Sequence, residues 1–203
     1  MQPLRVALAQ LNTTVGDLDG NSALILDAAR RAADAGAELV AFPELAITGY
    51  PPEDLLIRSA FIEDARTALE QLARDADGLP PLIVGCIGFD HHLYNAAAVL
   101  HGGQIAGMYY KHELPNYGVF DEFRYFQPGD EAPIFRIGGV DIGVTICEDI
   151  WFPGGPMREQ AGAVGVGLAH ESTWIMRPRR RRLSKARRLW ASEHVVAAFP
   201  PGN

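Results

Sequence analysis

Three residues of types that can take part in amide chemistry each follow a strand-like stretch of the sequence. Glu44 comes after "LVAFP", Lys111 after "IAGMYY" and Cys147 after "IGVTI". In α/β sheets the carboxyl ends of strands line the crevice in which ligands bind. We therefore expect these side chains to meet at one edge of a sheet. The alternative for each one alone is a structural role: a small buried thiol, a solvated or capping carboxylate, and a surface ammonium.

Together the three residues are suited to amide hydrolysis through a thioester. A cysteine attacks as its thiolate, which needs a base or a positive charge nearby. Glu44 would accept the thiol proton and return it to the leaving amine, a task that requires burial or an acidic neighbour to raise the pKa of its carboxyl group. Lys111 and a backbone N–H such as that of Glu148 would stabilise the oxyanion.

The usage of lysine and cysteine sharpens this prediction. Lys111 is the only lysine in residues 1–170, where nine arginines fill the other basic positions. Since a compact ammonium and a planar guanidinium are not interchangeable, this favours a specific role for Lys111. Cys86, inside "LIVGCIGF", is predicted to be a buried structural residue. Two cysteines without a CxxC spacing predict neither a disulfide framework nor a metal site.

The elements that would position these residues alternate between strands and helices. "LRVALAQLN" is strand-like, "NSALILDAARRAADAGA" has apolar residues at helical spacing, and "ELVAFPE" is again extended. A second helix is predicted over "SAFIEDARTALEQLARDA", followed by the strand "LIVGCIGF". "LYNAAAVLHGGQIAGMYYK" and "APIFRIGGVDIGVTIC" each carry a Gly-Gly hairpin signal. The pattern indicates an α/β fold with mixed strand pairing and helices on a face.

Composition and charge limit the class of protein. With 203 residues and 48% apolar composition, one globular domain is expected. No run approaches the roughly 18 apolar residues of a membrane span and no leader-like segment opens the chain, which predicts a cytoplasmic protein without a membrane partner. Residues 171–203 hold 8 Lys and Arg against 2 Asp and Glu, leaving 10 against 23 in residues 1–170. The acidic body argues against nucleic-acid binding, and an arginine run without interleaved aromatics supports it only weakly.

Three segments resemble the signature segments of the nitrilase, or carbon–nitrogen hydrolase, superfamily. They are "AFPELAITGYPPEDLL", "YYKHELPNYGVFDEFRYFQPG" and "VTICEDIWFPGG". More narrowly, "TGYPPEDLL", "LPNYGVFDE" and "CEDIW" are similar to the N-terminal glutaminase domains of glutamine-dependent NAD synthetases. The resemblance covers residues 4 to about 163 and implies a nitrilase-like α-β-β-α sandwich.

The resemblance also implies roles for individual residues. Glu44 matches the general base, Lys111 the oxyanion-stabilising lysine and Cys147 the nucleophile. Tyr117, in "LPNYG", matches a tyrosine that contacts the glutamine substrate. Glu122, in "FDE", is either an additional active-site carboxylate or a solvated loop acid.

The same resemblance gives a local structure around the cysteine. Cys147 would lie at a sharp turn from a strand into a helix, exposed to a pocket. Glu148 and Asp149 would organise this turn through their N–H groups and side chains, so their acidity does not require direct chemistry.

The implied reaction converts L-glutamine into glutamate and ammonia. In the family the ammonia passes to a synthetase domain or subunit, which uses ATP to amidate nicotinic acid adenine dinucleotide. The Gly-rich ATP-binding loop of that domain does not occur in this sequence, so no cofactor is expected on this chain. The family also tends to form homo-oligomers, which makes assembly with further copies an expectation.

The sequence departs from the family after residue 163. Residues 1–163 are interpreted as a partial carbon–nitrogen hydrolase (glutaminase) domain, incomplete at its C-terminus, and residues 164–203 as an atypical basic tail that is irregular or disordered. Trp174 and Arg180 stand where a substrate-contacting serine and a lysine are expected. Together with the change in charge, this suggests a reading-frame change shortly after Ala163.

These departures leave three hypotheses for the activity of the chain. It is the glutaminase portion of a glutamine-dependent NAD synthetase, or a truncated fragment with the family's sequence and no turnover. The third hypothesis is a stand-alone carbon–nitrogen hydrolase that acts on another small amide.

Overall fold

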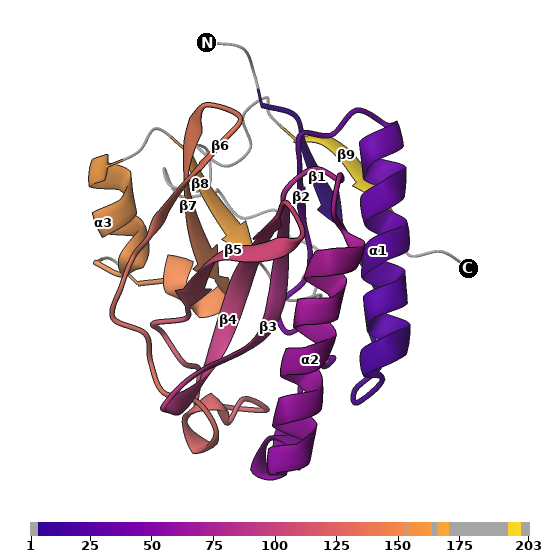
Figure 1. Cartoon of the computed structure of the whole chain (residues 1–203). Coiled ribbons are helices and arrows are strands. Elements are labelled where there is room, and N and C mark those ends of the chain that lie inside the picture. Colours follow the sequence, from indigo (N-terminus) through magenta and orange to yellow (C-terminus); the bar gives the residue numbers. More distant parts are fainter. Residues whose placement is uncertain (1–3, 153, 164–165, 171–194, 200–203) are drawn as a thin grey trace.

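The computed structural model describes residues 4–152, 154–163, 166–170 and 195–199, and these residues form four layers. Two helices pack side by side on one face of a six-stranded sheet, a three-stranded sheet lies on its other face, and a third helix lies outside the small sheet (Figure 1). This is the α-β-β-α sandwich that the resemblance implies.

The large sheet combines parallel strands with two consecutive antiparallel pairs, β3 with β4 and β4 with β5. Its order is β5-β4-β3-β2-β1-β9, with β1, β2, β3 and β9 parallel and β4 antiparallel to both neighbours. The bounds are β1 Val6–Ala9, β2 Leu39–Ala41, β3 Leu82–Asp90, β4 His92–His101, β5 Gln104–Tyr110 and β9 Val195–Phe199. The hairpin of β4 and β5 turns at Gly102 and Gly103, both at positive φ, as the Gly-Gly signal predicts.

The small sheet places β7 between an antiparallel and a parallel neighbour. Its order is β6-β7-β8, with β6 Ile134–Ile137, β7 Val140–Ile146 and β8 Val166–His170. Helix α3 (Pro156–Ala163) connects β7 to β8 on the outer face. The parallel connection from β7 through α3 into β8 leaves the C-terminal end of β7 free to carry a site.

The two long helices are close to the predicted ranges. Helix α1 (Leu18–Asp34) begins three residues before the quoted helical stretch, because the side chain of Asp17 accepts a hydrogen bond from the Gly20 N–H at 3.0 Å and caps this end. Gly36, at φ 78°, follows its end. Helix α2 (Ser59–Asp75) matches its prediction to within one residue.

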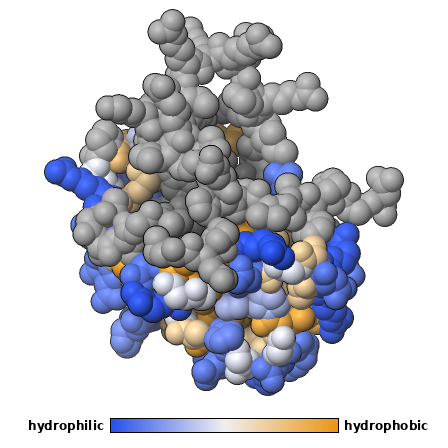
Figure 2. All heavy atoms as spheres, turned by 90° about the horizontal axis from the view of Figure 1, so that it is seen from above, coloured by the Kyte–Doolittle hydropathy of each residue, from blue (hydrophilic) through white to orange (hydrophobic). Residues whose placement is uncertain are grey.

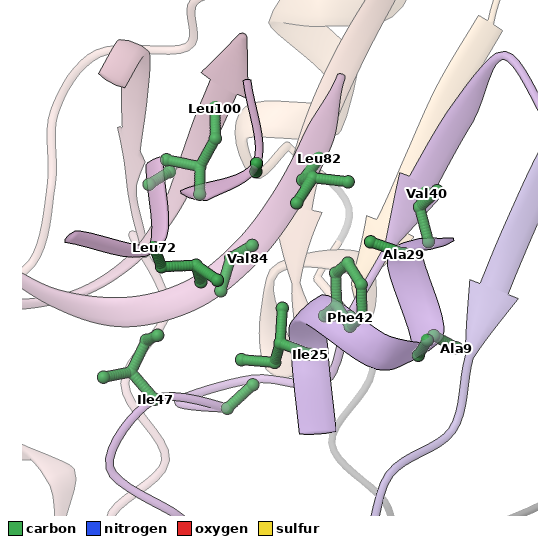
Figure 3. Packing of buried hydrophobic residues seen from close by; sticks show 14 of the residues in the cluster. Ala9, Ile25, Ala29, Val40, Phe42, Ile47, Leu72, Leu82, Val84 and Leu100 are labelled. Atoms are coloured by element: carbon green, nitrogen blue, oxygen red, sulfur yellow. The ribbon is translucent and has the colours of Figure 1, made fainter. Parts of the chain in front are cut away.

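Two apolar cores hold the layers together because strands of the large sheet bury side chains on both faces. Between this sheet and the helices, Ile25 and Leu72 pack against Val40, Phe42 and Val84 (Figure 3). The second core lies between the two sheets and contains Leu39, Ile83, Val99, Tyr109, Ile142, Val144 and Ile146. Burial of this kind supplies the main driving force for folding.

The segment from residue 164 onward is described only in part. The short strands β8 and β9 fall within this segment, for which the sequence predicts irregular chain. Trp174 and Arg180 lie outside the described residues. Among the residues that are described, no helix is both long and apolar enough to cross a membrane. Seen from above, the described side chains at the periphery are mainly hydrophilic, with smaller hydrophobic patches between them (Figure 2).

Candidate active site

The predicted glutamate and lysine meet in the interior of the protein. Lys111 Nζ donates to Glu44 Oε1 at 2.6 Å and to both oxygens of Glu122, at 3.0 Å to Oε1 and 2.9 Å to Oε2. The Lys111 side chain is fully buried, and the two carboxylates are at most 5% exposed. Glu122 is therefore a buried member of this cluster and not a solvated loop acid.

The ends of two strands deliver Glu44 and Lys111 to this point. Glu44 lies three residues after β2, and Lys111 directly follows β5. The backbone of Lys111 is held on both sides, because its N–H donates to Asn95 O at 2.9 Å and its carbonyl accepts from Gly129 N at 2.8 Å. A rigid backbone allows a long side chain to keep one geometry in the interior.

Two further polar residues complete the cluster, and the sequence analysis missed both. Asn95 Nδ2 donates to Glu44 Oε1 at 2.6 Å and to Glu122 Oε2 at 3.3 Å. Tyr50 OH donates to Glu122 Oε1 at 3.0 Å. The signal for Asn95 is its position in the apolar stretch "LYNAAAVL", since a polar residue in a buried strand needs a partner. Tyr50 lies in "TGYPPEDLL", but its contact depends on tertiary structure.

The charges in the cluster shift the pKa values of its members. Burial alone would lower the pKa of Lys111, but the charges of Glu44 and Glu122 outweigh this effect, and the pKa is raised. Lys111 is therefore a cation at neutral pH. Burial and then the Glu44 carboxylate raise the pKa of Glu122 to about 7. Burial and then the Glu122 carboxylate raise the pKa of Tyr50, which keeps its phenol a hydrogen-bond donor.

Glu44 has one oxygen in use and one available. Oε1 accepts from both Asn95 and Lys111, whereas the buried Oε2 has no hydrogen-bond partner among the described residues. A buried carboxylate oxygen without a partner costs free energy, and such an atom in a native structure calls for an explanation.

Cys147 lies where the small sheet ends and a short helix begins. Strand β7 ends at Ile146, and the 3₁₀ helix η3 (Cys147–Ile150) starts with the cysteine itself, at φ 46°. A residue with a Cβ is strained in this left-handed region, and such strain often occurs at functional turns. The turn from strand to helix agrees with the prediction. Cys147 is partly exposed, and in its ionised form it would interact electrostatically with both Lys111 and Tyr50.

Cys86 differs from Cys147 in its location and its exposure. It lies in the middle of β3 within the core under the helices and is 1% exposed. Burial raises the pKa of its thiol to about 12, so it stays protonated at neutral pH. This agrees with its predicted structural role.

Tyr117 and Glu148 form a pair near the cysteine. Tyr117 OH lies 3.1 Å from Glu148 Oε1 and 2.9 Å from Oε2, and it donates its proton to this carboxylate. The hydrogen bond to Glu148 and partial burial raise the pKa of Tyr117, and the charges of Cys147 and Lys111 also act on it. Tyr117 is 59% exposed. The pair thus lies between the buried cluster and solvent.

A cavity of about 250 Å³ adjoins the cluster. Tyr50 and Glu122 contribute to its wall, together with Phe120 and Tyr125. Cys147, which is predicted to face a pocket, is not among the residues that line this cavity, and neither are Glu44 and Lys111. The described residues contain no group of three or more His, Cys, Asp or Glu that could hold a metal ion.

Comparison with known proteins identifies the family. A model of the carbon-nitrogen hydrolases matches residues 5–194, and the chain therefore belongs to the carbon-nitrogen hydrolase family.

Among curated proteins, the chain is similar to glutamine-dependent NAD(+) synthetases. It is 48% identical to that of Thermotoga maritima over 169 residues, covering 83% of this chain and 29% of the relative. The Aquifex aeolicus protein is 43% identical over 159 residues, covering 78% of this chain and 28% of the relative. The chain thus spans less than a third of the length of these relatives.

Two solved structures have similar folds. Glutamine-dependent NAD+ synthetase from Acinetobacter baumannii superposes with a TM-score of 0.77 at 35% identity, covering 84% of this chain and 32% of that one. An amidase from Nesterenkonia superposes with a TM-score of 0.70 at 28% identity, covering 83% of this chain and 65% of that one.

Proposed function

We propose that this chain hydrolyses L-glutamine to glutamate and ammonia through a thioester on Cys147, as the glutaminase portion of a glutamine-dependent NAD(+) synthetase. The observation that carries the proposal is the buried cluster in which Lys111 Nζ bridges Glu44 and Glu122 while Glu44 Oε2 has no partner among the described residues. The similarity to synthetases of this kind supports glutamine as the amide.

In the first half of the reaction, Glu44 acts as the base. Its Oε2 accepts the proton from the Cys147 thiol, and the thiolate attacks the side-chain carbonyl carbon of glutamine. Lys111 and the backbone N–H of Glu148 stabilise the oxyanion that forms. The carbon–nitrogen bond then breaks, Glu44 returns the proton to the nitrogen, and ammonia leaves a thioester behind.

In the second half, water replaces the thiolate. Glu44 Oε2 accepts a proton from the water as its oxygen attacks the thioester carbon, and Lys111 again stabilises the oxyanion. The carbon–sulfur bond breaks and the sulfur takes the proton back from Glu44. Glutamate leaves and the free thiol is restored.

The remaining members of the site support these steps. Glu122 holds Lys111 through two hydrogen bonds of 3.0 and 2.9 Å, so the ammonium keeps its position between two carboxylates. Tyr117 contacts the glutamine substrate at the exposed side of the site, and its hydroxyl is already oriented by Glu148.

The partner of this activity is a synthetase domain or subunit that consumes the ammonia. ATP would bind to that partner and not to the residues of this site, and the glutaminase reaction derived above uses no metal ion or cofactor. Assembly with further copies of the chain is part of the same proposal.

The test is glutamine-dependent ammonia release by the purified 203-residue chain, with Cys147→Ala and Cys86→Ala as a matched pair. Release that is lost in Cys147→Ala and kept in Cys86→Ala would support the proposal. No release from a folded chain would favour the fragment without turnover. Faster release from acetamide than from glutamine would favour a stand-alone amidase.

A further inference from the structure

Asp149 is a fully buried carboxylate that lies outside the chemical steps derived above. Its Oδ1 accepts hydrogen bonds from the backbone N–H groups of His112 at 3.1 Å and Glu113 at 2.8 Å. Its Oδ2 accepts from Tyr109 OH at 2.7 Å and from the backbone N–H of Ile146 at 2.8 Å. A carboxylate has about four acceptor positions, so this side chain is saturated.

The four donors lie next to the two residues that must act together. Ile146 immediately precedes Cys147, whereas His112 and Glu113 immediately follow Lys111. Tyr109 lies on β5, two residues before Lys111. One side chain therefore joins the end of β7 in the small sheet to the end of β5 in the large sheet.

The bond to Ile146 also closes the strained turn. Cys147 has φ 46°, and a residue in this region keeps its conformation only when its surroundings hold it there. The Asp149 side chain reaches back three residues to the N–H that precedes the cysteine, which fixes the direction in which the turn leaves the strand.

We propose that Asp149 is a positioning residue that sets the distance between the Cys147 thiol and the Lys111 ammonium by joining the loops that carry them. Its role is distinct from that of Glu148, whose side chain pairs with Tyr117 on the exposed side.

An asparagine at this position would break the connection on one side only. Its single oxygen can still accept from His112 and Glu113, but its NH₂ group then faces Tyr109 OH and the Ile146 N–H. The tyrosine hydroxyl can rotate to accept, whereas a backbone N–H cannot. Asp149→Asn is therefore expected to release the cysteine turn while the lysine loop stays in place.

The measurement is the rate of Cys147 alkylation by iodoacetamide as a function of pH, followed by peptide mapping. The ionisable groups that surround the thiol are Lys111, Glu44, Glu122, Tyr50, Tyr117, Glu148 and Asp149 itself. Removing the negative charge of Asp149 would by itself favour the thiolate and move the midpoint to lower pH. Loss of proximity to the Lys111 ammonium would disfavour the thiolate and move the midpoint to higher pH.

Under the proposal, Asp149→Asn slows alkylation at pH 7 about tenfold and moves the midpoint to higher pH. Tyr109→Phe removes one donor of the four and is expected to change the rate by less than about twofold. Asp141→Asn is the matched control on β7, the strand that leads into the cysteine turn, because Asp141 pairs with the exposed Arg136. A midpoint that is unchanged or lower in Asp149→Asn would overturn the proposal.

Unfolding curves of each variant measure its folded fraction, and so check that the protein that is alkylated is folded. The positioning role of Asp149 rests on the proposed function. Its test is nevertheless independent of that function, because alkylation of Cys147 requires no glutamine. Should the chain release no ammonia while the alkylation shift is observed, the proposed function fails and the positioning role stands. Should ammonia release occur without the alkylation shift, the proposed function stands and the positioning role of Asp149 fails.

Discussion

At the scale of single residues, the site is a buried cation between two buried carboxylates. Three charges in the interior are stabilised only because they pair closely, and removing one of them leaves the others without compensation. Lys111 contacts Glu44 and Glu122 at 2.6 to 3.0 Å. Its contribution to stability and its contribution to chemistry should therefore be lost together.

Replacement of Lys111 by methionine tests this coupling. Two carboxylates would lie side by side without their counter-charge, and we expect the free energy of unfolding to fall by about 3 to 5 kcal/mol. Ammonia release should fall to background, because no cation faces the oxyanion. Denaturant titration and the ammonia assay measure the two effects. Arg66→Met is the control: Arg66 and Glu63 form an exposed pair on α2, whose loss should leave the free energy of unfolding nearly unchanged.

Glu122 provides a prediction on pH dependence. Burial and the neighbouring Glu44 raise its pKa from 4.5 to about 7 in the folded state. The folded protein therefore holds this proton more tightly than the unfolded chain, and the free energy of unfolding falls as pH rises from about 4.5 to 7. In Glu122→Gln this decrease should be smaller by about 3 kcal/mol. Denaturant titrations at pH 4.5 and 7 measure it.

The control for this measurement is Glu70→Gln, because Glu70 is exposed on α2. It should keep the pH dependence of the unsubstituted chain. A Glu122→Gln protein with that same dependence would contradict a raised pKa for Glu122.

Residue types and spacing predicted the position of Glu44, Lys111 and Cys147 at the ends of strands, because this depends only on local pattern. The partners of these residues follow from tertiary structure and were not predictable in the same way. Asn95 reaches Glu44 across 51 positions of sequence, and Tyr50 reaches Glu122 across 72. The roles of the site residues remain predictions.

At the scale of elements, a glycine on β3 allows Glu44 to reach the cluster. A Cβ atom on Gly85 would lie 2.3 Å from Pro43 O and 2.4 Å from Leu45 N, which is too close for either backbone atom. Gly85 O also accepts a hydrogen bond from Ile47 N at 3.2 Å. The turn that carries Glu44 therefore packs directly on the backbone of this strand.

Gly85→Ala should displace this turn and with it the carboxylate of Glu44. We expect ammonia release to fall at least about tenfold and stability to fall by roughly 1 to 3 kcal/mol, as in overpacked cores. Gly88→Ala is the control on the same strand, because its Cβ would meet side-chain atoms of Tyr110 and Ala96 and no backbone atom of the Glu44 turn. Equal activity of the two variants would argue against the packing of the Glu44 turn as the cause.

The elements themselves were largely predictable. Apolar periodicity located α1, α2 and β3, and both Gly-Gly pairs mark hairpins, because these signals are local. Strand order was not predictable in this way: β1 lies between β2 and β9, and the second hairpin joins a different sheet from the first. Which strands become neighbours depends on which other elements pack on the two apolar faces of each strand.

At the scale of the whole molecule, the reactivity of the buried Cys86 thiol can show when the layers of the sandwich separate. Cys86 lies on β3 within the core between the large sheet and the helices, is 1% exposed, and has its pKa raised to about 12 by burial. Neither its position nor its ionisation allows alkylation in the folded state. Its labelling therefore requires that the layers separate, whereas Cys147 is partly exposed in the folded protein.

Two neighbouring residues of α1 test this prediction. Ile25 is fully buried in that core, whereas Leu24 is 45% exposed. Ile25→Ala should cost about 2 to 5 kcal/mol through lost burial and the cavity it leaves, and Leu24→Ala much less. If Cys86 reacts only through global opening, its alkylation in native buffer should accelerate about 30-fold or more in Ile25→Ala. The rate at Cys147 should change little in either variant, because the layers need not separate for that thiol to react. Equal acceleration at both thiols would show that the cysteine turn also opens with the core.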